Sequence, residues 1–308
     1  MSLTSPSYVR DLLARHKIRL KKSLGQHFLV DENILKKIAA AAQLTTEETV
    51  VEIGAGIGTL TQALAQRAGR VIAVEIDERL IPLLHEHVSS YPNVVVVHQD
   101  FLQFDLRSAE DLSSSSSLGK GNKGLGHKRL SVVGNLPYSV TTPILEKLVE
   151  AHEILKTATL LVQQEVAEKL CAAPGSRDAS AITIFMQSFA EVQRVFSVSR
   201  HVFFPVPEVD SALVRLEFYE HPRFRAPKEL FFKVVRAAFN LRRKTLKQAL
   251  TRSPLLALQP EIALKALDRA QLDPQRRGET LSLEEFDRLA RALATLLEPR
   301  NCAVYRSR

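Results

Sequence analysis

The sequence has no tryptophan, two methionines and two cysteines among its 308 residues. Cys171 and Cys302 are too few and too far apart for a disulfide scaffold or a cysteine-rich zinc module, and such usage is typical of a reducing compartment. No run approaches the roughly 18 apolar residues of a membrane-spanning helix, and the N-terminus lacks the apolar core of a secretory signal. These absences predict a cytoplasmic protein without a membrane anchor.

Charge is unevenly distributed along the chain, which carries a net charge of +8. Residues 10–22 hold six Lys or Arg and one acid, and residues 221–252 hold ten Lys or Arg and one acid, whereas residues 50–106 hold three Arg and seven acids. Solvated surface is the simpler interpretation of one basic run, but two basic segments around an acidic middle favour a phosphate-backbone partner.

The middle of the chain alternates apolar runs with helical patterns. Runs rich in Val, Ile and Leu, each followed by a helix, are typical of a parallel sheet that is covered on both faces. The right-handed crossover rule then predicts an α/β fold with a doubly wound, Rossmann-like sheet. The expected strands are residues 49–53, 70–76, 93–98, 130–133, 158–162 and 210–218, and the first two crossover helices are 59–68 and 78–90.

Composition also predicts the domain limits. Residues 1–45 form a basic arm and a helix, and residues 46–219 form the α/β domain. The Ser- and Gly-rich residues 113–126 are expected to be a flexible insertion within it. Residues 220–308 are expected to form a smaller all-helical domain for RNA or ribosome binding. Its predicted helices are residues 228–240, 242–251, 261–269 and 283–297.

A glycine-rich turn, Gly54-Ala55-Gly56-Ile57-Gly58, joins the first of these strands to its helix. Such a turn lets a ligand approach the backbone at the carboxyl edge of a sheet. Glu75 follows 21 residues after Gly54, the spacing at which an acid meets ribose hydroxyls in a dinucleotide or in S-adenosylmethionine. A pyrophosphate avoids nearby anions, so the acids at successive strand ends, Glu52, Glu75, Asp77 and Asp100, favour the cationic S-adenosylmethionine. Asp100 is expected to accept a hydrogen bond from the adenine amine of that cofactor.

A second motif, Gly134-Asn135-Leu136-Pro137-Tyr138, follows the fourth predicted strand. An exocyclic amine of adenine or cytosine is a poor nucleophile, because its lone pair is delocalised into the ring. The Asn135 side-chain oxygen and a backbone carbonyl at Leu136 or Pro137 can orient both N–H groups and direct that lone pair at a methyl donor. Pro137 fixes the turn, and Tyr138 offers a face on which an extruded base can stack. A turn with a core tyrosine is the alternative.

These motifs resemble those of the small-subunit ribosomal RNA adenine N6,N6-dimethyltransferase family. Residues 22–29, 51–58, 135–138, 164–167, 203–211 and 239–246 follow in the family's order. The resemblance implies a class I methyltransferase sheet and dimethylation of two adjacent adenines near the 3′ end of small-subunit ribosomal RNA during ribosome assembly. It implies cofactor binding by His27, Leu29, Gly54, Glu75, Asp100 and Asn135. It also implies a catalytic site of Asn135, Pro137, Tyr138 and Phe203, with Phe203 beside the target adenine.

Two positions depart from the family pattern. His27 stands where the family often has asparagine, and we expect either side chain to donate a hydrogen bond to the cofactor. Ala179-Ser180-Ala181 stands where a Tyr-Gly-Arg sequence is common, so the role of that arginine is missing or is taken by Arg177. The nine histidines show no metal-ligand spacing, and no metal site is expected.

Three alternatives remain open at this point. A methyltransferase of the antibiotic-resistance type would use the same catalytic core on large-subunit RNA. A non-catalytic assembly or transcription factor could keep the fold for binding, although the intact Asn135–Tyr138 motif argues against it. A nicotinamide oxidoreductase is the most distant. We expect a monomer whose partner is the small ribosomal subunit and its RNA.

Overall fold

The computed structural model describes residues 3–21, 24–109, 129–241 and 243–297. Its chain divides into two compact units, the first formed by Met1–Cys171 and Phe189–His221, the second by Ala172–Ser188 and Pro222–Arg308. The predicted insertion, residues 113–126, lies outside the described residues. Ala172–Ser188 thus belongs to the same unit as the C-terminal helices. The sequence predicted that the helical domain starts at residue 220 and did not include this segment. The functions assigned to residues 1–45, 46–219 and 220–308 remain predictions.

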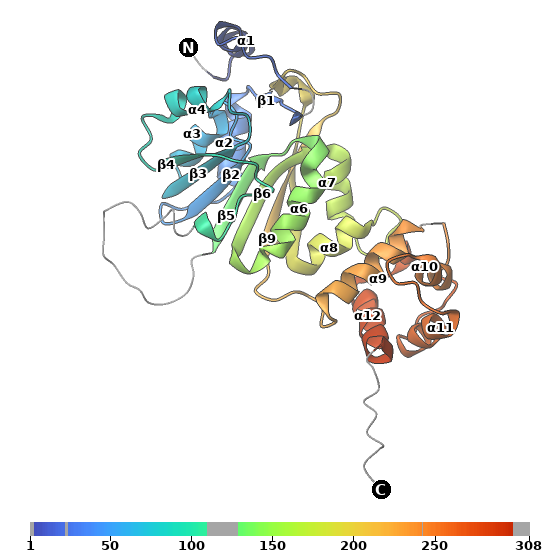
Figure 1. The fold of residues 1–308 in the computed structure, drawn as a ribbon. Helices are drawn as coiled ribbons and strands as arrows, with labels where there is room; N and C mark the ends of the chain where they lie inside the picture. Colours follow the sequence, from blue (N-terminus) through green and yellow to red (C-terminus); the bar gives the residue numbers. More distant parts are fainter. Residues whose placement is uncertain (1–2, 22–23, 110–128, 242, 298–308) are drawn as a thin grey trace, which may run out of the picture. The chain divides into compact units, whose positions relative to one another are not determined.

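A mixed seven-stranded sheet forms the centre of the first unit (Figure 1), with the order β4-β3-β2-β5-β6-β9-β7. Five neighbouring strands, from β4 at one edge to β6, are parallel to one another. The apolar runs of β2, β3, β5 and β6 are mostly buried, as expected where helices cover both faces of a sheet. The predicted α/β class with a Rossmann-like sheet is therefore confirmed. The strands are β2 (Thr49–Ile53), β3 (Arg70–Glu75), β4 (Val94–His98), β5 (Leu130–Asn135), β6 (Leu155–Gln163), β7 (Ala190–Val198) and β9 (Ser211–Phe218).

One strand of this sheet, β7, was not predicted from the sequence, whereas β9 corresponds to the strand predicted at residues 210–218. Strand β9 is antiparallel to both β6 and β7. Strand β7 lies at the edge, and most of its side chains are exposed or half-buried, so it lacks the continuous apolar run of a buried strand. A separate two-stranded sheet pairs β1 (Phe28–Leu29) with β8 (Phe203–Phe204). Pairing between such short strands depends on tertiary contacts rather than on local pattern.

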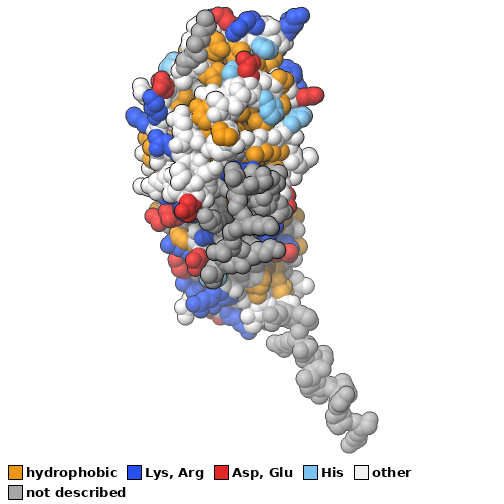
Figure 2. Space-filling model, turned by 90° about the vertical axis from the view of Figure 1, so that its left-hand side faces the viewer, with side chains coloured by type: hydrophobic (Ala, Val, Ile, Leu, Met, Phe, Trp, Pro, Cys, Tyr) orange, Lys and Arg blue, Asp and Glu red, His pale blue; other side chains and the backbone are white. Residues whose placement is uncertain are grey.

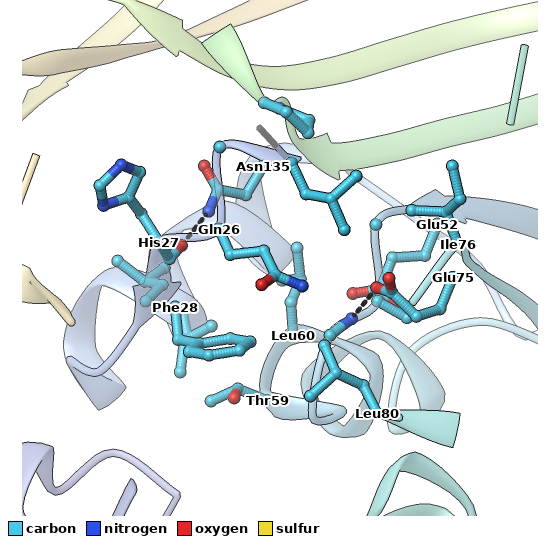
Figure 3. Close-up of a pocket in the computed structure, with 18 residues that line it drawn as sticks. Gln26, His27, Phe28, Glu52, Thr59, Leu60, Glu75, Ile76, Leu80 and Asn135 are labelled. Carbon is cyan, nitrogen blue, oxygen red and sulfur yellow. Dashed lines mark hydrogen bonds between the residues drawn. The ribbon is translucent and has the colours of Figure 1, made fainter. Parts of the chain in front are cut away.

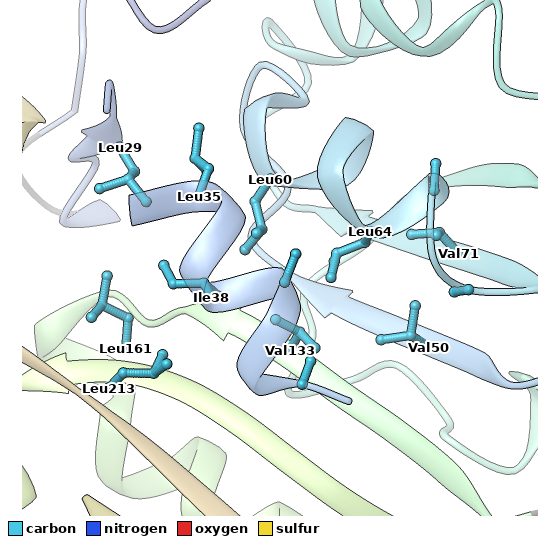
Figure 4. Close-up of a cluster of buried hydrophobic side chains, with 14 of the residues drawn as sticks. Leu29, Leu35, Ile38, Val50, Leu60, Leu64, Val71, Val133, Leu161 and Leu213 are labelled. Carbon is cyan, nitrogen blue, oxygen red and sulfur yellow. The ribbon is translucent and has the colours of Figure 1, made fainter. Parts of the chain in front are cut away.

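A hydrophobic cluster joins helices α2 and α3 to one face of the sheet (Figure 4). Leu35 and Ile38 of α2 and Leu60 and Leu64 of α3 pack against Val50 of β2, and all five are buried. At the start of α2 the Asp31 carboxylate accepts from the Ile34 N–H at 2.9 Å and caps the helix. The helices of this unit are α1 (Pro6–Arg15), α2 (Glu32–Ala41), α3 (Thr59–Ala65), α4 (Ile81–Val88), α6 (Thr141–Glu150) and α7 (Gln164–Cys171), with short 3₁₀ turns that include η2 (Tyr138–Val140).

The second unit is helical, as predicted for the C-terminal region. Its core contains Phe224 stacked on Phe231, with ring centroids 4.2 Å apart. The buried Asp287 carboxylate accepts from the backbone N–H groups of Arg225 and Ala226, and these bonds hold the start of the unit. The helices are α8 (Ala181–Phe189, whose last residue belongs to the first unit), α9 (Lys228–Asn240), α10 (Leu246–Arg252), α11 (Pro260–Arg269) and α12 (Leu283–Leu297). Among the described residues, none of the helices has the length and apolar character needed to cross a membrane.

Gly134 in β5 packs closely against Ile53 of β2. A Cβ at this position would lie 2.9 Å from Ile53 Cβ and 3.0 Å from the Ile53 carbonyl oxygen. We therefore expect Gly134→Ala to lower the free energy of unfolding by about 1–3 kcal/mol, because the strands must separate to admit the methyl group. Urea denaturation measures this, with Ser139→Ala at an exposed position as the control. Equal stability of both variants would contradict the close approach.

Candidate active site

A pocket of about 730 Å³ lies at the carboxyl ends of β2, β3 and β5 (Figure 3). The glycine turn forms one wall, and Gly54, Gly56 and Gly58 all have positive φ angles of 59° to 88°. A Cβ on Gly56 would lie 3.0 Å from the Phe28 ring, so this glycine lets the N-terminal segment pack on the turn. The pocket is lined by Leu24, Gly25, Gln26, His27, Phe28, Leu29, Leu35, Glu52, Gly54, Ala55, Gly56, Thr59, Leu60, Glu75, Ile76, Leu80, Asn135 and Pro137.

Glu75 holds the glycine turn through its carboxylate. One oxygen accepts from the Gly56 N–H at 2.7 Å and the other accepts from the Asp77 N–H at 2.8 Å. Burial raises the pKa of Glu75, and the backbone bonds from Asp77 and Gly56 oppose that shift. Each carboxylate oxygen can accept more than one hydrogen bond, so Glu75 can still accept from ribose hydroxyls at this strand end.

Glu52 is more deeply buried than Glu75, with 1% of its surface exposed. Its Oε2 has no hydrogen-bond partner. Burial raises the pKa of Glu52 to about 8, the neighbouring Thr61 hydroxyl opposes that shift, and the charge of Glu75 adds to it. Glu52 is therefore mostly protonated and uncharged at pH 7 before a ligand binds.

Asp77 does not line the pocket, although the sequence grouped it with the acids of the cofactor crevice. Its carboxylate accepts from the Arg79 guanidinium at 2.8 and 2.6 Å and from Gln26 Nε2 at 2.8 Å. Arg79 also donates to the Arg19 carbonyl at 2.8 Å. We call Gln26, Asp77 and Arg79 the Asp77 clasp; it fastens the N-terminal segment to the loop after β3. Because Arg79 neutralises Asp77, this acid does not serve to attract a cation.

Asp100 lines a second pocket, of about 590 Å³, which adjoins the first. The two share Leu24, Gly54, Ile76 and Pro137, so one elongated ligand can occupy both. Most of the side chains that line the second pocket are apolar, which suits the planar ring of a base. Asp100 Oδ1 accepts from the Leu102 N–H at 2.9 Å. The expected cofactor residues Gly54, Glu75 and Asp100 thus lie around one continuous cavity.

Asn135 lies at the end of β5 on the side of the pocket opposite Glu75 (Figure 3). Its Nδ2 donates to the His27 carbonyl at 2.8 Å, which orients the amide and leaves Oδ1 as an acceptor. The Pro137 carbonyl already accepts from the Val140 N–H at 3.2 Å and from the Thr141 hydroxyl at 3.1 Å. Of the two predicted backbone acceptors, the Leu136 carbonyl is therefore the better candidate.

Tyr138 follows directly, and its ring is half-buried. Its centroid lies 6.0 Å from that of the His27 ring, at an interplanar angle of 25°. The Tyr138 hydroxyl lies 2.9 Å from the hydroxyl of the fully buried Ser211, and burial raises the pKa of Tyr138. The sequence gave no role to Ser211 beyond its place in the 203–211 motif. Its hydroxyl fixes the orientation of the tyrosine ring.

His27 and Leu29 both line the first pocket. His27 Nδ1 lies 2.7 Å from the Pro205 carbonyl, and because a carbonyl only accepts, Nδ1 carries the proton. Nε2 is therefore the ring nitrogen that remains for a ligand, and the expected hydrogen bond from His27 to the cofactor stays a prediction. Leu29 is buried and pairs with Phe203 across the two-stranded sheet.

Phe203, which is expected beside the target adenine, lies in the core, and its stacking role stays a prediction. It is 2% exposed, belongs to the cluster of Figure 4 and lines neither pocket. The pleat of β8 directs Phe203 into this core and Phe204 to the opposite face, where the Arg10 guanidinium lies 5.6 Å from its ring centroid. The sequence could not separate the two adjacent phenylalanines, because only the β1–β8 pairing decides which is buried.

No group of His, Cys, Asp and Glu suited to a metal ion occurs in the described part of the chain. Where Figure 2 shows described residues, Lys and Arg are interspersed with Asp and Glu. The helical unit carries most of the predicted basic segment. Its exposed side chains include Arg223, Arg225, Lys228, Lys233, Arg236, Arg243, Lys244 and Arg252, whereas Arg242 lies outside the described residues.

Comparison with known proteins gives consistent results at the levels of family, sequence and structure. The family described as "Ribosomal RNA adenine dimethylase" matches residues 17–294. "Ribosomal RNA small subunit methyltransferase A" of Geobacillus thermodenitrificans is 43% identical, covering 96% of this chain and 98% of the relative. The protein of the same description from Pelotomaculum thermopropionicum is 44% identical, covering 94% and 96%.

Two solved structures share the fold over most of the chain. A dimethyladenosine transferase from Plasmodium falciparum has a TM-score of 0.70 and 26% identity, covering 86% of this chain and 96% of that one. The 23S rRNA methyltransferase ErmE has a TM-score of 0.63 and 30% identity, covering 87% and 99%.

The Asp77 clasp generates a prediction about pH. The hydrogen bond from Arg79 lowers the pKa of Asp77 from 3.8 to about 2, so the clasp stabilises the fold above pH 4 and this contribution is lost as the pH falls towards 2. We expect Asp77→Asn to lower the free energy of unfolding at pH 7 by about 1–2 kcal/mol, an amount reduced by the partial exposure of Arg79. The difference should disappear near pH 2. Urea denaturation from pH 3 to 7 tests the trend.

Glu32→Gln is the matched control for this series. Glu32 pairs with Lys36 at the surface, where both side chains are more than 60% exposed, so its replacement should change stability by less than about 0.5 kcal/mol. An Asp77→Asn variant as stable as the wild type at pH 7 would show that the clasp contributes nothing to the fold.

Proposed function

The chain belongs to the ribosomal RNA adenine dimethylase family, whose methyl donor is S-adenosylmethionine, and we propose that it dimethylates the exocyclic amines of two adjacent adenines near the 3′ end of small-subunit ribosomal RNA. The observation that carries this proposal is the orientation of Asn135. Its Nδ2 is bonded to the His27 carbonyl, so Oδ1 is available to accept from a substrate amine. This acceptor lies beside the cavity that suits the cofactor.

Two acceptors are needed to align an aromatic amine for attack. Asn135 Oδ1 accepts from one N–H group and the Leu136 carbonyl accepts from the other, which favours a pyramidal nitrogen with its lone pair aimed at the methyl group. Preorganised dipoles of this kind act strongly where water is excluded. The proton lost after methylation passes to solvent, so no general base is required.

The residues of the joined pockets fit S-adenosylmethionine. No Lys or Arg is among the described residues that line either pocket, so nothing there repels a cation. Glu75 is proposed to accept from the ribose hydroxyls and Asp100 from the adenine amine, with Ile76 against the base. Gly54, His27 and Leu29 complete the enclosure. The bound cofactor supplies an electrophilic methyl group, and these residues orient it towards the side of Asn135.

The target base is proposed to stack on Tyr138, whose hydroxyl is fixed by Ser211. Pro137 holds the turn that presents this ring. Phe203 is the weakest of the four proposed catalytic residues, because it is buried in the core and reaches the base only if β8 rearranges. Base extrusion of this kind is typical of enzymes that act on a base.

RNA contacts outside the pocket are proposed for the two basic segments. The exposed Lys and Arg side chains of residues 223–252 in the helical unit and those of residues 10–21 can neutralise phosphates. We further propose that the protein acts as a monomer in the cytoplasm. Its partner is a small ribosomal particle rather than a membrane.

Sequence identity to known relatives favours the small ribosomal subunit over the large one as the substrate. The near-full-length relatives named for the small subunit are 43–44% identical, whereas ErmE, named for 23S RNA, is 30% identical. The experiment is to incubate unmethylated small and large subunits with the protein and S-adenosylmethionine, then measure dimethyladenosine by mass spectrometry. We expect it in the small subunit only. Dimethyladenosine in the large subunit alone supports the resistance-type enzyme. Its absence from both subunits supports a non-catalytic factor.

Replacing Asn135 should separate catalysis from RNA binding. We expect Asn135→Ala to slow single-turnover methylation of the small subunit about 100- to 1000-fold, since a preorganised transition-state contact contributes about 2.7–4 kcal/mol. Binding to the ribosomal particle should change little, because one hydrogen-bond acceptor contributes little compared with the many phosphate contacts. Asn33→Ala, at an exposed position on α2, is the control. A near wild-type rate for Asn135→Ala refutes the amine-orienting mechanism.

Two substitutions at Tyr138 should have different effects on activity and stability. Tyr138→Phe keeps the ring but leaves the buried Ser211 hydroxyl without this partner, so most activity should remain while stability falls by about 0.5–1.5 kcal/mol. Tyr138→Ala should lose base stacking of about 1–3 kcal/mol and therefore most of the rate at limiting particle concentration. Single-turnover rates and thermal unfolding measure both effects. Equal inactivity of the two variants would mean that the hydroxyl, not the ring, is required.

A further inference from the structure

An exposed arginine of the N-terminal helix α1, Arg10, lies against an aromatic ring instead of a carboxylate. Its guanidinium carbon is 5.6 Å from the ring centroid of Phe204. Within the described residues, the Arg10 side chain forms no hydrogen bond and no ion pair, not even with the adjacent Asp11. Arg79 and Arg291, by contrast, are each paired with an aspartate. None of the described side chains therefore neutralises Arg10.

The packing of α1 determines where this charge lies. Helix α1 packs beside the small sheet of β1 and β8 (Figure 1). Val9, Leu12 and Leu13 of α1 are buried in a hydrophobic cluster, and the half-buried Phe204 packs against the same cluster. The face of an aromatic ring attracts a guanidinium but does not take up its N–H donors as a carboxylate does. Phe204 thus orients Arg10 and leaves it able to bind an anion.

The position of Phe204 brings Arg10 beside the proposed platform for the target base. The residue after Phe204 is Pro205, whose carbonyl accepts from His27 Nδ1 at 2.7 Å. The centroid of the His27 ring lies 6.0 Å from that of Tyr138, on which the base is proposed to stack. One ring contact, one peptide unit and one hydrogen bond therefore connect Arg10 to the wall of the site.

On the basis of the proposed function, we propose that Arg10 binds a phosphate of the RNA strand beside the target adenine. A planar guanidinium can donate two parallel hydrogen bonds to one phosphate group. A base that leaves its stack turns about its own backbone, and a phosphate held by Arg10 keeps that backbone at the site while the base reaches Tyr138. Phe204 is the positioning residue, because it acts on the RNA through Arg10.

The first experiment locates Arg10 on the RNA. In a variant with Cys171→Ser and Cys302→Ser, Arg10→Cys provides the single thiol for attachment of iron-EDTA, and the protein is bound to unmethylated small subunits. Hydroxyl radicals from the iron should cleave the RNA at nucleotides that flank the adenines dimethylated by the wild-type protein. Cleavage confined to other regions, or none while the protein co-sediments with the subunit, overturns the proposal.

Arg67→Cys in the same background is the control for location. Arg67 is exposed and precedes β3, which begins at Arg70, so it lies at the amino ends of the parallel strands, away from the pocket. A probe at this position should not cleave beside the adenines. Equal cleavage there from both positions overturns the assignment to Arg10. Dimethylation of the same subunits by the wild-type protein is measured separately, and its absence refutes the proposed function.

The second experiment measures the charge of Arg10 by co-sedimentation with the small subunit over a range of salt concentrations. We expect Arg10→Ala to bind about tenfold more weakly at low salt, since one charge-assisted contact is lost. The slope of log affinity against log salt concentration should fall by about 0.7–0.9. Arg67→Ala removes the same charge and should leave the slope unchanged. An unchanged slope for Arg10→Ala overturns the phosphate contact.

A double-mutant cycle tests the role of Phe204. Phe204→Leu keeps an apolar side chain against the cluster but removes the ring face, so it should weaken binding to the small subunit although Phe204 itself does not touch RNA. Arg10→Ala should then have a smaller effect in the Phe204→Leu background than in the wild type. Affinity for S-adenosylhomocysteine should be the same in all four proteins, which shows that the site remains folded. Fully additive effects of the two substitutions overturn the positioning role of Phe204.

Discussion

The architecture of the site depends on the hydrogen bonds that the Glu75 carboxylate accepts from two backbone N–H groups. The bond from Gly56 holds the turn after β2, and the bond from Asp77 holds the loop after β3. One side chain thereby sets the spacing of two strand ends, and the clasp extends that order to the N-terminal segment through Gln26 and Arg79. Since Glu75 is 5% exposed, these bonds act in a medium of low polarity, where they are strong.

The charge in the pocket is smaller than a count of acids indicates. Among the acids at the strand ends, Asp77 is neutralised by Arg79 and Glu52 by a proton. The site therefore avoids the repulsion that four ionised carboxylates would cause. This arrangement keeps an acid-rich site compatible with a stable fold, and burial rather than composition decides which acids carry charge.

Much of the fold was predictable because local pattern and tertiary structure agree. The valine-rich strands and the four C-terminal helices are amphipathic or buried in ways that periodicity reveals. Strand β7 was not predicted because its exposed edge carries Glu191, Gln193 and Arg194 rather than an apolar run. At the site, sequence order indicated Gly54, Glu75, Asp100 and Asn135 as cavity residues. It could not show that Phe203 is in the core, because this depends on the pairing of β1 with β8. Nor could it show that Asp77 is paired with Arg79, because this depends on the conformation of the loop after β3.

The contact between the His27 ring and the Pro205 carbonyl has a consequence for biosynthesis. The two residues are 178 positions apart, and Asn135, which bonds to the His27 carbonyl, comes between them. At a ribosomal rate of about 5–20 residues per second, His27 waits roughly 9–36 s before Pro205 has been synthesised. The wall of the site that His27 forms is thus completed late in translation. A nascent chain cannot hold that wall closed until most of the enzyme has been made.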